Sequence, residues 1–131
     1  MKSVFADTLY WVAIARPNDS WRQAAEQARQ SLGEVQLVTT DEVLSEFLTA
    51  MSHGGGEVRR RAVETVRQIQ ASPDVTVIAQ SRDTFLAAID RYAAREDKQY
   101  SLTDCSSMNA MQASGIREVL TNDHHFRSRG I

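Results

Sequence analysis

Four acidic residues from distant parts of the chain stand at positions that could bring their side chains to one site. Asp7 ends a short apolar run that predicts a buried first strand, and Asp123 directly follows the last predicted strand. Glu46 lies in the helix after the second predicted strand, and Asp104 lies in the first turn of the helix that leads into the last strand. Because ligands in open α/β sheets bind beyond the carboxyl ends of the strands, we expect the four carboxylates to converge on one edge of the sheet.

A cluster of this kind has a definite chemistry. Carboxylates that lie close together raise one another's pKa, so the cluster is tolerable when a cation sits among them. Oxygen ligands without cysteine or histidine favour a hard ion, either Mg²⁺ or Mn²⁺. Such an ion contacts phosphate oxygens and lowers the pKa of a bound water. The four acids therefore predict the attack of water on a phosphodiester.

Each acid also has an ordinary structural interpretation. Asp104, in a first helical turn, is typical of a capping residue that complements the helix dipole. Asp7 at a strand end is typical of a turn former, Glu46 of a solvated helix residue, and Asp123 of a cap for a short terminal helix. Any one of these acids alone favours the structural interpretation. The joint pattern, in matching positions of an alternating fold, favours a common site.

The acids are positioned by short apolar runs that alternate with amphipathic segments. This order favours an α/β fold with a mostly parallel sheet, and the length of 131 residues fits one domain over residues 1–131. We predict strands over residues 4–6, 35–39, 75–79 and 119–121, and helices over residues 9–15, 20–32, 40–51 and 57–71, followed by two more that begin near residues 82 and 102.

Helix boundaries are predicted from capping residues and glycines. Thr39 with Glu42 reads as a capping box for the third helix, which should stop at residues 54–56, a run of three glycines. The last of these helices should end at Gly115. The predicted N-caps of the other helices are Asp19 or Ser20, then Ser81, and then Ser101 or Thr103.

Composition excludes several classes of protein. The net charge is −2, so contact with nucleic acid would need local basic patches or bound cations. Arg59, Arg60 and Arg61 are one such patch, interpreted either as a solvated face or as a phosphate contact. Cys105 is the only cysteine, which excludes an internal disulfide and fits a reducing cytoplasm. The N-terminus does not read as a secretory signal, and no segment is apolar for long enough to span a bilayer.

Taken together, four blocks of the sequence resemble the PIN-domain family. They follow one another in order, with spacing similar to that of the family, and cover essentially the whole chain. One difference is that Leu9-Tyr10-Trp11 is bulkier than the small residues often found there, which affects the shape of the pocket floor. The blocks are Val4-Phe5-Ala6-Asp7-Thr8, Thr39-Thr40-Asp41-Glu42-Val43-Leu44-Ser45-Glu46-Phe47, Ser101-Leu102-Thr103-Asp104-Cys105 and Leu120-Thr121-Asn122-Asp123-His124-His125-Phe126.

The resemblance implies a Rossmann-like PIN domain whose central, mostly parallel sheet of four to five strands is flanked by helices. It implies an Mg²⁺- or Mn²⁺-dependent endoribonuclease in which the four acids bind the metal and carry the catalysis. Thr8 and Thr103 would assist by hydrogen bonding to a carboxylate or to a metal-bound water. Many small members resemble VapC-type toxins, which implies an RNA substrate, a cognate antitoxin, a homodimer and a cytoplasmic location without membrane contact.

Other interpretations of the same residues stay open. A signalling receiver domain also gathers acids at strand ends, but it needs a lysine near the last strand, and no lysine follows Lys98. A PIN-fold module that binds RNA or acts as a scaffold without catalysis would keep the fold alone. The segment from His53 to Gly56 resembles an esterase oxyanion loop, yet the chain lacks the matching Gly-x-Ser-x-Gly elbow. His124 and His125 are adjacent, so they are poorly placed to share one ion.

Overall fold

The computed structural model describes residues 1–121 and 129–130 and confirms the predicted alternation of strands and helices. A 3₁₀ turn over Ser52–Gly54 joins the third and fourth helices. The strands are β1 (Lys2–Ala6), β2 (Val35–Thr40), β3 (Val75–Ile78), β4 (Glu118–Leu120) and β5 (Arg129–Gly130), and the helices are α1 (Thr8–Ala15), α2 (Arg22–Ser31), α3 (Asp41–Met51), α4 (Gly55–Ala71), α5 (Arg82–Ala94) and α6 (Leu102–Ala113).

The strands form a sheet with the order β3-β2-β1-β4-β5. Strands β1 to β4 pair in parallel, and β5 pairs antiparallel with β4. Strand β1 lies in the middle of the sheet and pairs with both β2 and β4, with Phe5 opposite Val38 on one side and Val119 on the other. The predicted α/β class with a mostly parallel sheet of four to five strands is therefore confirmed.

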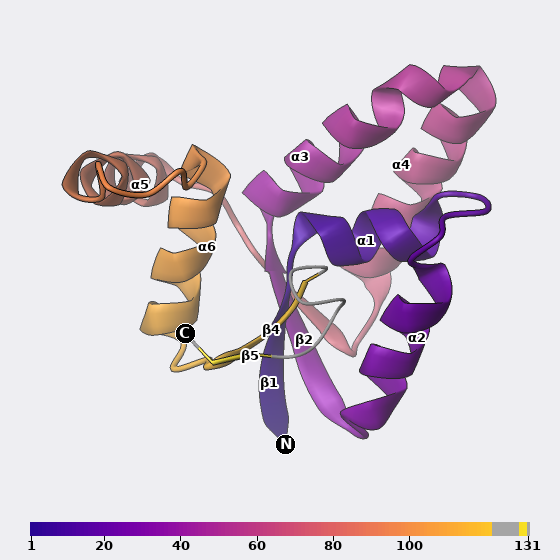
Figure 1. The fold of residues 1–131 in the computed structure, drawn as a ribbon, viewed down its shortest axis with the longest axis horizontal. Helices are drawn as coiled ribbons and strands as arrows, with labels where there is room; N and C mark the ends of the chain where they lie inside the picture. The colour runs from indigo at the N-terminus through magenta and orange to yellow at the C-terminus, as the bar shows by residue number, and fades with distance from the viewer. Residues whose placement is uncertain (122–128, 131) are drawn as a thin grey trace.

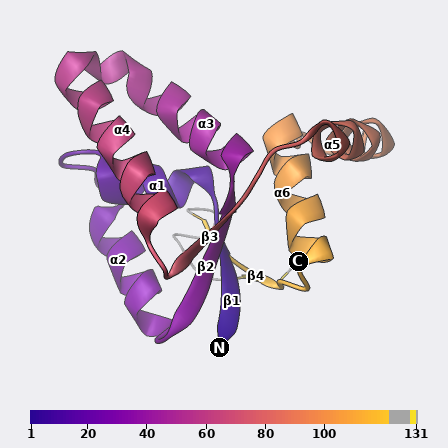
Figure 2. The ribbon, with the colours of Figure 1, turned by 180° about the vertical axis from the view of Figure 1, so that it is seen from behind.

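Helices cover both faces of this sheet. Figures 1 and 2 show α5 and α6 on one side of the strands and α1, α2 and α4 on the other, with the α3–α4 pair extending beyond the carboxyl end of β2. Burial on both faces explains why β1 ends in the continuous apolar run Val4, Phe5 and Ala6, each with no exposed surface. None of the helices within residues 1–121 is long and apolar enough to cross a membrane.

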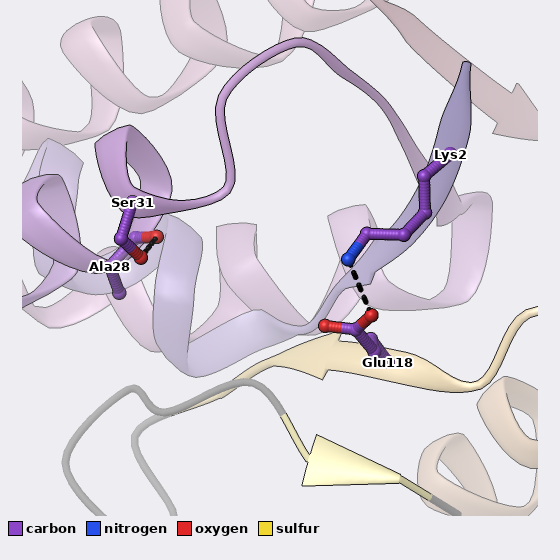
Figure 3. Close-up of polar contacts among 4 residues, drawn as sticks. All are labelled: Lys2, Ala28, Ser31 and Glu118. Carbon is purple, nitrogen blue, oxygen red and sulfur yellow. Dashed lines mark hydrogen bonds and ion pairs between the residues drawn. The ribbon is translucent and has the colours of Figure 1, made fainter.

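The amino ends of β1 and β4 are joined by an ion pair at the surface. Lys2 Nζ lies 2.6 Å from Glu118 Oε1, as Figure 3 shows. Because the lysine side chain is 52% exposed, we expect the Lys2–Glu118 pair to contribute at most about 1 kcal/mol to the free energy of unfolding.

Figure 3 also shows a hydrogen bond in the last turn of α2, where the Ser31 hydroxyl donates to the carbonyl of Ala28.

The predicted capping box at Thr39 is wrong. Strand β2 continues through Thr40, which lies opposite Ile78, so the helix begins one residue later than predicted. Thr40 is the N-cap, and its hydroxyl accepts the backbone N–H of Val43 at 3.1 Å. The Thr39 hydroxyl instead donates to the carbonyl of Ala6, at 3.0 Å, and ties β2 to β1.

Two other predicted boundaries are also wrong. Helix α3 ends at Met51, before the glycines of residues 54–56, and α4 begins at Gly55 rather than at Glu57. Ser81 and Ser101 are both N-caps with a complete capping box, so Ser101 rather than Thr103 caps α6. The N-cap of α2 is Trp21, which makes no capping bond with its side chain, and neither Asp19 nor Ser20 is the cap. Asp19 forms a turn just before it, because its carboxylate accepts the N–H of Trp21 at 2.8 Å.

Candidate active site

Asp7 lies at the junction of the two central strands and the first helix. Its N–H donates to the carbonyl of Leu120 at 3.1 Å, which fixes the end of β1 against the end of β4. Its Oδ1 accepts the N–H groups of Leu9 and Tyr10 at 3.1 and 3.3 Å, which makes it the N-cap of α1. A helix N-terminus favours a negative charge, so a carboxylate is well placed at this position beside the carboxyl end of the sheet.

A hydrogen bond joins the second predicted acid to this junction. The Thr8 hydroxyl donates to Glu46 Oε1 at 2.5 Å. Thr8 is the first residue of α1 and is 8% exposed, whereas Glu46 lies in the middle of α3. The contact is of the charge-assisted type, which is shorter and stronger than a hydrogen bond between neutral groups. It brings the carboxylate of Glu46 next to the residue that follows Asp7.

Asp104 is an exposed residue in the capping box of α6. Its Oδ2 accepts the N–H of Ser101 at 3.0 Å, and its own N–H donates to the Ser101 hydroxyl at 3.0 Å. The structural interpretation of this acid is therefore confirmed. An ionised carboxylate has about four acceptor positions, so a capping bond leaves capacity for a further ligand.

A cavity of about 360 Å³ lies between α3, α5 and α6, on the side of α3 that carries Glu46. Glu46 and Thr103, two of the predicted site residues, both line it. Helix α3 contributes a stripe at the spacing i, i+3, i+4 and i+7, which is one face of a helix. This stripe consists of Glu42, Ser45, Glu46 and Thr49.

The opposite walls of the cavity mix apolar and polar groups. Gln80, in the segment that follows β3, and Phe85 of α5 face Leu102 and Ser106 of α6 across the space. One hydrogen bond crosses between α3 and α6, because the Ser106 hydroxyl donates to Glu42 Oε2 at 2.6 Å. The carboxylate of Glu42 is therefore held at the wall of the same cavity as Glu46.

The structure places three of the predicted site residues close together, namely Thr8, Glu46 and Thr103. Thr8 contacts Glu46, Asp7 is adjacent to Thr8 in the chain, and Asp104 is adjacent to Thr103. Among residues 1–121 and 129–130, no three acidic, histidine or cysteine side chains are grouped closely enough to hold a metal ion. Asp123 lies outside the described residues, as do His124 and His125. The four-carboxylate site therefore stays a prediction.

The arginine triplet lies on α4 and contributes no side chain to the cavity wall. Arg59, Arg60 and Arg61 are all exposed, and Arg60 pairs with Glu57 at 2.8 Å. The solvated-face interpretation accounts for what is seen of Arg60. An RNA contact at this triplet stays a prediction.

Sequence reasoning missed four residues of this cavity that matter below, namely Glu42, Gln80, Phe85 and Ser106. The sequence pattern places Glu42 in a capping box and gives no signal that Ser106 belongs to a site. The available signal was the spacing of four residues between Glu42 and Glu46, which places two carboxylates on the same helix face. The contact with Ser106 could not be read from the sequence, because 64 residues separate the partners.

Comparison with known families defines the class of protein. The family model of the PIN domain matches residues 4–131, and the chain therefore belongs to the PIN domain family. This agrees with the fold described above and confirms the family predicted from the four sequence blocks.

Particular relatives can then be named. The chain is 26% identical over 128 residues to the 23S rRNA-specific endonuclease VapC20 of Mycobacterium tuberculosis, a match that covers 98% of this chain and 95% of the relative. The crystal structure of that protein, described as a sarcin-ricin loop cleaving toxin, superposes with a TM-score of 0.80 over 94% of this chain and 92% of the other. A toxin–antitoxin complex from Klebsiella pneumoniae shares the fold at 15% identity, with a TM-score of 0.62 over 94% of this chain and 88% of the other.

Proposed function

We propose that this protein is a divalent-metal-dependent endoribonuclease that hydrolyses RNA phosphodiesters and acts as the toxin of a VapBC-type pair. The observation that carries the proposal is the hydrogen bond from Thr8 to Glu46, which joins the end of β1, where Asp7 lies, to the cavity wall. Similarity over nearly the full length to VapC20, an endonuclease specific for 23S rRNA, supports ribosomal RNA as the substrate class.

The donor set fits a hard divalent ion. The predicted ligands Asp7, Glu46, Asp104 and Asp123 offer only oxygen atoms, which suits Mg²⁺ or Mn²⁺. When bound, the ion would stabilise charge on the phosphate and lower the pKa of a water. Thr8 holds one oxygen of Glu46, which leaves the other to bind a ligand. Thr103, on the facing wall, supplies a hydroxyl that could bind a water or a phosphate oxygen.

The direct test is RNA cleavage by Asp7→Asn. Asparagine is also a good N-cap, so this change removes the charge while α1 keeps its cap. We expect cleavage of an RNA that contains the sarcin–ricin loop, in the presence of Mg²⁺, to fall by about 100-fold or more, the scale of losing a group that stabilises the transition state. EDTA should abolish cleavage by the wild type.

Asp90→Asn provides a matched control, because Asp90 is exposed on α5 and does not line the cavity. It should cleave like the wild type. Equal, EDTA-resistant cleavage by the wild type and by Asp7→Asn would overturn the proposed mechanism.

A PIN-fold module that binds RNA or serves as a scaffold without catalysis is the second candidate. It would keep the fold described above and would need no metal site. Such a module would retard labelled RNA in a gel without cleaving it and would show no specific change in melting temperature with Mn²⁺.

The proposed partners follow from the toxin assignment. We expect a homodimer in the cytoplasm, a cognate antitoxin that blocks the acidic site, and contact of Arg59, Arg60 and Arg61 with RNA phosphates. Light scattering would measure the mass of the isolated protein. Replacing all three arginines with glutamine should weaken RNA binding and reduce its dependence on salt.

A further inference from the structure

The cavity between α3, α5 and α6 has a composition that the hydrolysis of a phosphodiester does not require. Its walls combine an aromatic ring, Phe85, with an amide, Gln80, and a carboxylate, Glu42, that is separate from the four predicted metal ligands. Within residues 1–121, no lysine or arginine lines it. A second phosphate is therefore a poor ligand for this space, whereas a flat group that donates hydrogen bonds is a good one.

The size of the cavity restricts the ligand to a small molecule or one nucleotide. Its volume of about 360 Å³ lies at the lower end of the roughly 300–1,000 Å³ typical of small-molecule pockets. Sequence-specific recognition of RNA mostly uses unpaired bases that leave the stack and lie against aromatic side chains. A duplex does not fit such a space, but one such base does. Phe85 is the aromatic side chain in the wall, and its ring also contacts the Arg82 guanidinium, 5.6 Å from the ring centre, so one face of the ring is left for a base.

Glu42 is the group that would distinguish one base from another by hydrogen bonding. Ser106 donates to its Oε2 at 2.6 Å, and this contact fixes the carboxylate between α3 and α6. An ionised carboxylate accepts about four hydrogen bonds, so at least two acceptor positions remain beyond the one used by Ser106. Being an acceptor only, the side chain selects base edges that present donors.

Guanine is the base whose pairing edge matches this group. It presents two adjacent donors, the N1–H and the N2 amino group, which a carboxylate accepts side by side. Adenine and cytosine each present an amino group next to an acceptor nitrogen, and uracil presents one N–H between two carbonyls. Only guanine therefore satisfies both oxygens without placing an acceptor against the negative charge.

We propose that this cavity binds one unpaired guanine of the RNA beside the cleaved phosphodiester, with Glu42 as the specificity-determining residue and Ser106 as the residue that positions it. The inference rests on the proposed ribonuclease function, because Glu46 and Thr103 line the same space. It adds to that function a preference for the base nearest the reacting phosphate.

The test compares RNA hairpins that differ at one loop position, which carries guanine, inosine, adenine, cytosine or uracil. We expect the wild type to have a kcat/KM for guanine about 10-fold or more above the values for the other bases, inosine included because it lacks the N2 amino group. This is the scale of a good two-bond contact to a base. Glu42→Gln should lower the ratio of guanine to inosine toward one and still cleave RNA.

Two further variants separate an effect on base preference from a general effect on folding or RNA binding. Ser106→Ala frees the Glu42 carboxylate and should reduce the preference for guanine partially, and Phe85→Leu should raise KM for every base by a similar factor. Glu64→Gln, an exposed carboxylate on α4, is the matched control and should keep the preference. Cleavage without base preference, or a preference for guanine that survives in Glu42→Gln, would overturn the proposal and leave the ribonuclease function intact.

A binding experiment separates failure of this inference from failure of the proposed function. Calorimetry with GMP, IMP and AMP on the full chain needs no cleavage. Tighter binding of GMP that is lost in Glu42→Gln would support the guanine site even if no RNA were cleaved. Equal binding of the three nucleotides, or none, would contradict it.

Discussion

Thr8 is the side chain whose contact has the clearest consequence for activity. Its hydroxyl donates to Glu46 from a position that is 8% exposed, so no solvent group can readily replace it. A hydrogen bond to a charged group is worth about 1.5–3 kcal/mol. We expect Thr8→Val to raise the Kd for Mn²⁺ and to lower RNA cleavage by about 10-fold or more.

Thr8→Ser is the control for this prediction, because it keeps the hydroxyl and removes only a methyl group. In Thr8→Ser, the Kd for Mn²⁺ measured by calorimetry and the kcat/KM for RNA should both stay close to the wild-type values. Equal losses in the serine and valine variants would mean that packing of the methyl group, rather than the hydrogen bond to Glu46, sets the activity.

Cys105 gives a second prediction for a single side chain. The residue has no exposed surface, and burial raises the pKa of its thiol above the ordinary value, whereas the charge of Arg91 acts in the opposite direction. A raised pKa means less thiolate at any given pH, and thiolate is the reactive form. Iodoacetamide at neutral pH should therefore leave the native protein unmodified. Mass spectrometry should detect one adduct after unfolding in guanidinium, and labelling of the native chain at the same rate would contradict this prediction.

Helix α6 ends in a motif that fixes the approach to β4. The N–H of Ile116 donates to the carbonyl of Met111, and the N–H of Gly115 donates to that of Gln112, which together form a Schellman motif. Gly115 has φ +68°, a conformation that costs other residues about 1–2 kcal/mol. Gly115→Ala should therefore lower the free energy of unfolding by about 1 kcal/mol, measured by urea denaturation.

Gly56→Ala is the matched control, since Gly56 lies inside α4 and an added Cβ would meet only the flexible end of Arg60, at 3.5 Å. This variant should be as stable as the wild type or more so, because alanine favours a helix. A loss of stability as large in Gly56→Ala as in Gly115→Ala would mean that the positive φ of Gly115 does not explain the loss.

Elements were predictable from the sequence where the signal is local. Ser81 and Gly115 are predicted correctly because a cap depends on a few consecutive residues, and Ser101 is one of the two caps that the sequence leaves open for α6. The cap of α3 is different, since the choice between Thr39 and Thr40 depends on the pairing of β2 with β3, where Thr40 lies opposite Ile78. A distant strand decides that boundary, so no local pattern contains it.

The packing of strands and helices in the whole molecule determines what the site can bind, and only part of that packing is predictable from the sequence. The rule that parallel strands carry ligands at their carboxyl ends predicts that Asp7 and Glu46 approach one another, and the Thr8–Glu46 bond agrees with it. The cavity, by contrast, arises where α3 meets α5 and α6. Its contact between Ser106 and Glu42 depends on how helices pack, which hydrophobic periodicity does not specify.

Metal binding tests the assembled fold, because the predicted ligands come from both ends of the chain. A ligand that binds only the folded state stabilises it by about 2.7 kcal/mol when its concentration is 100 times the Kd. We therefore expect Mn²⁺ to raise the melting temperature of the wild type and EDTA to reverse the increase. Glu46→Gln keeps an oxygen to accept the Thr8 hydroxyl but removes the charge, so its melting temperature should respond much less to Mn²⁺. Glu64→Gln should respond like the wild type, and an equal response in all three proteins would mean that Mn²⁺ binds elsewhere.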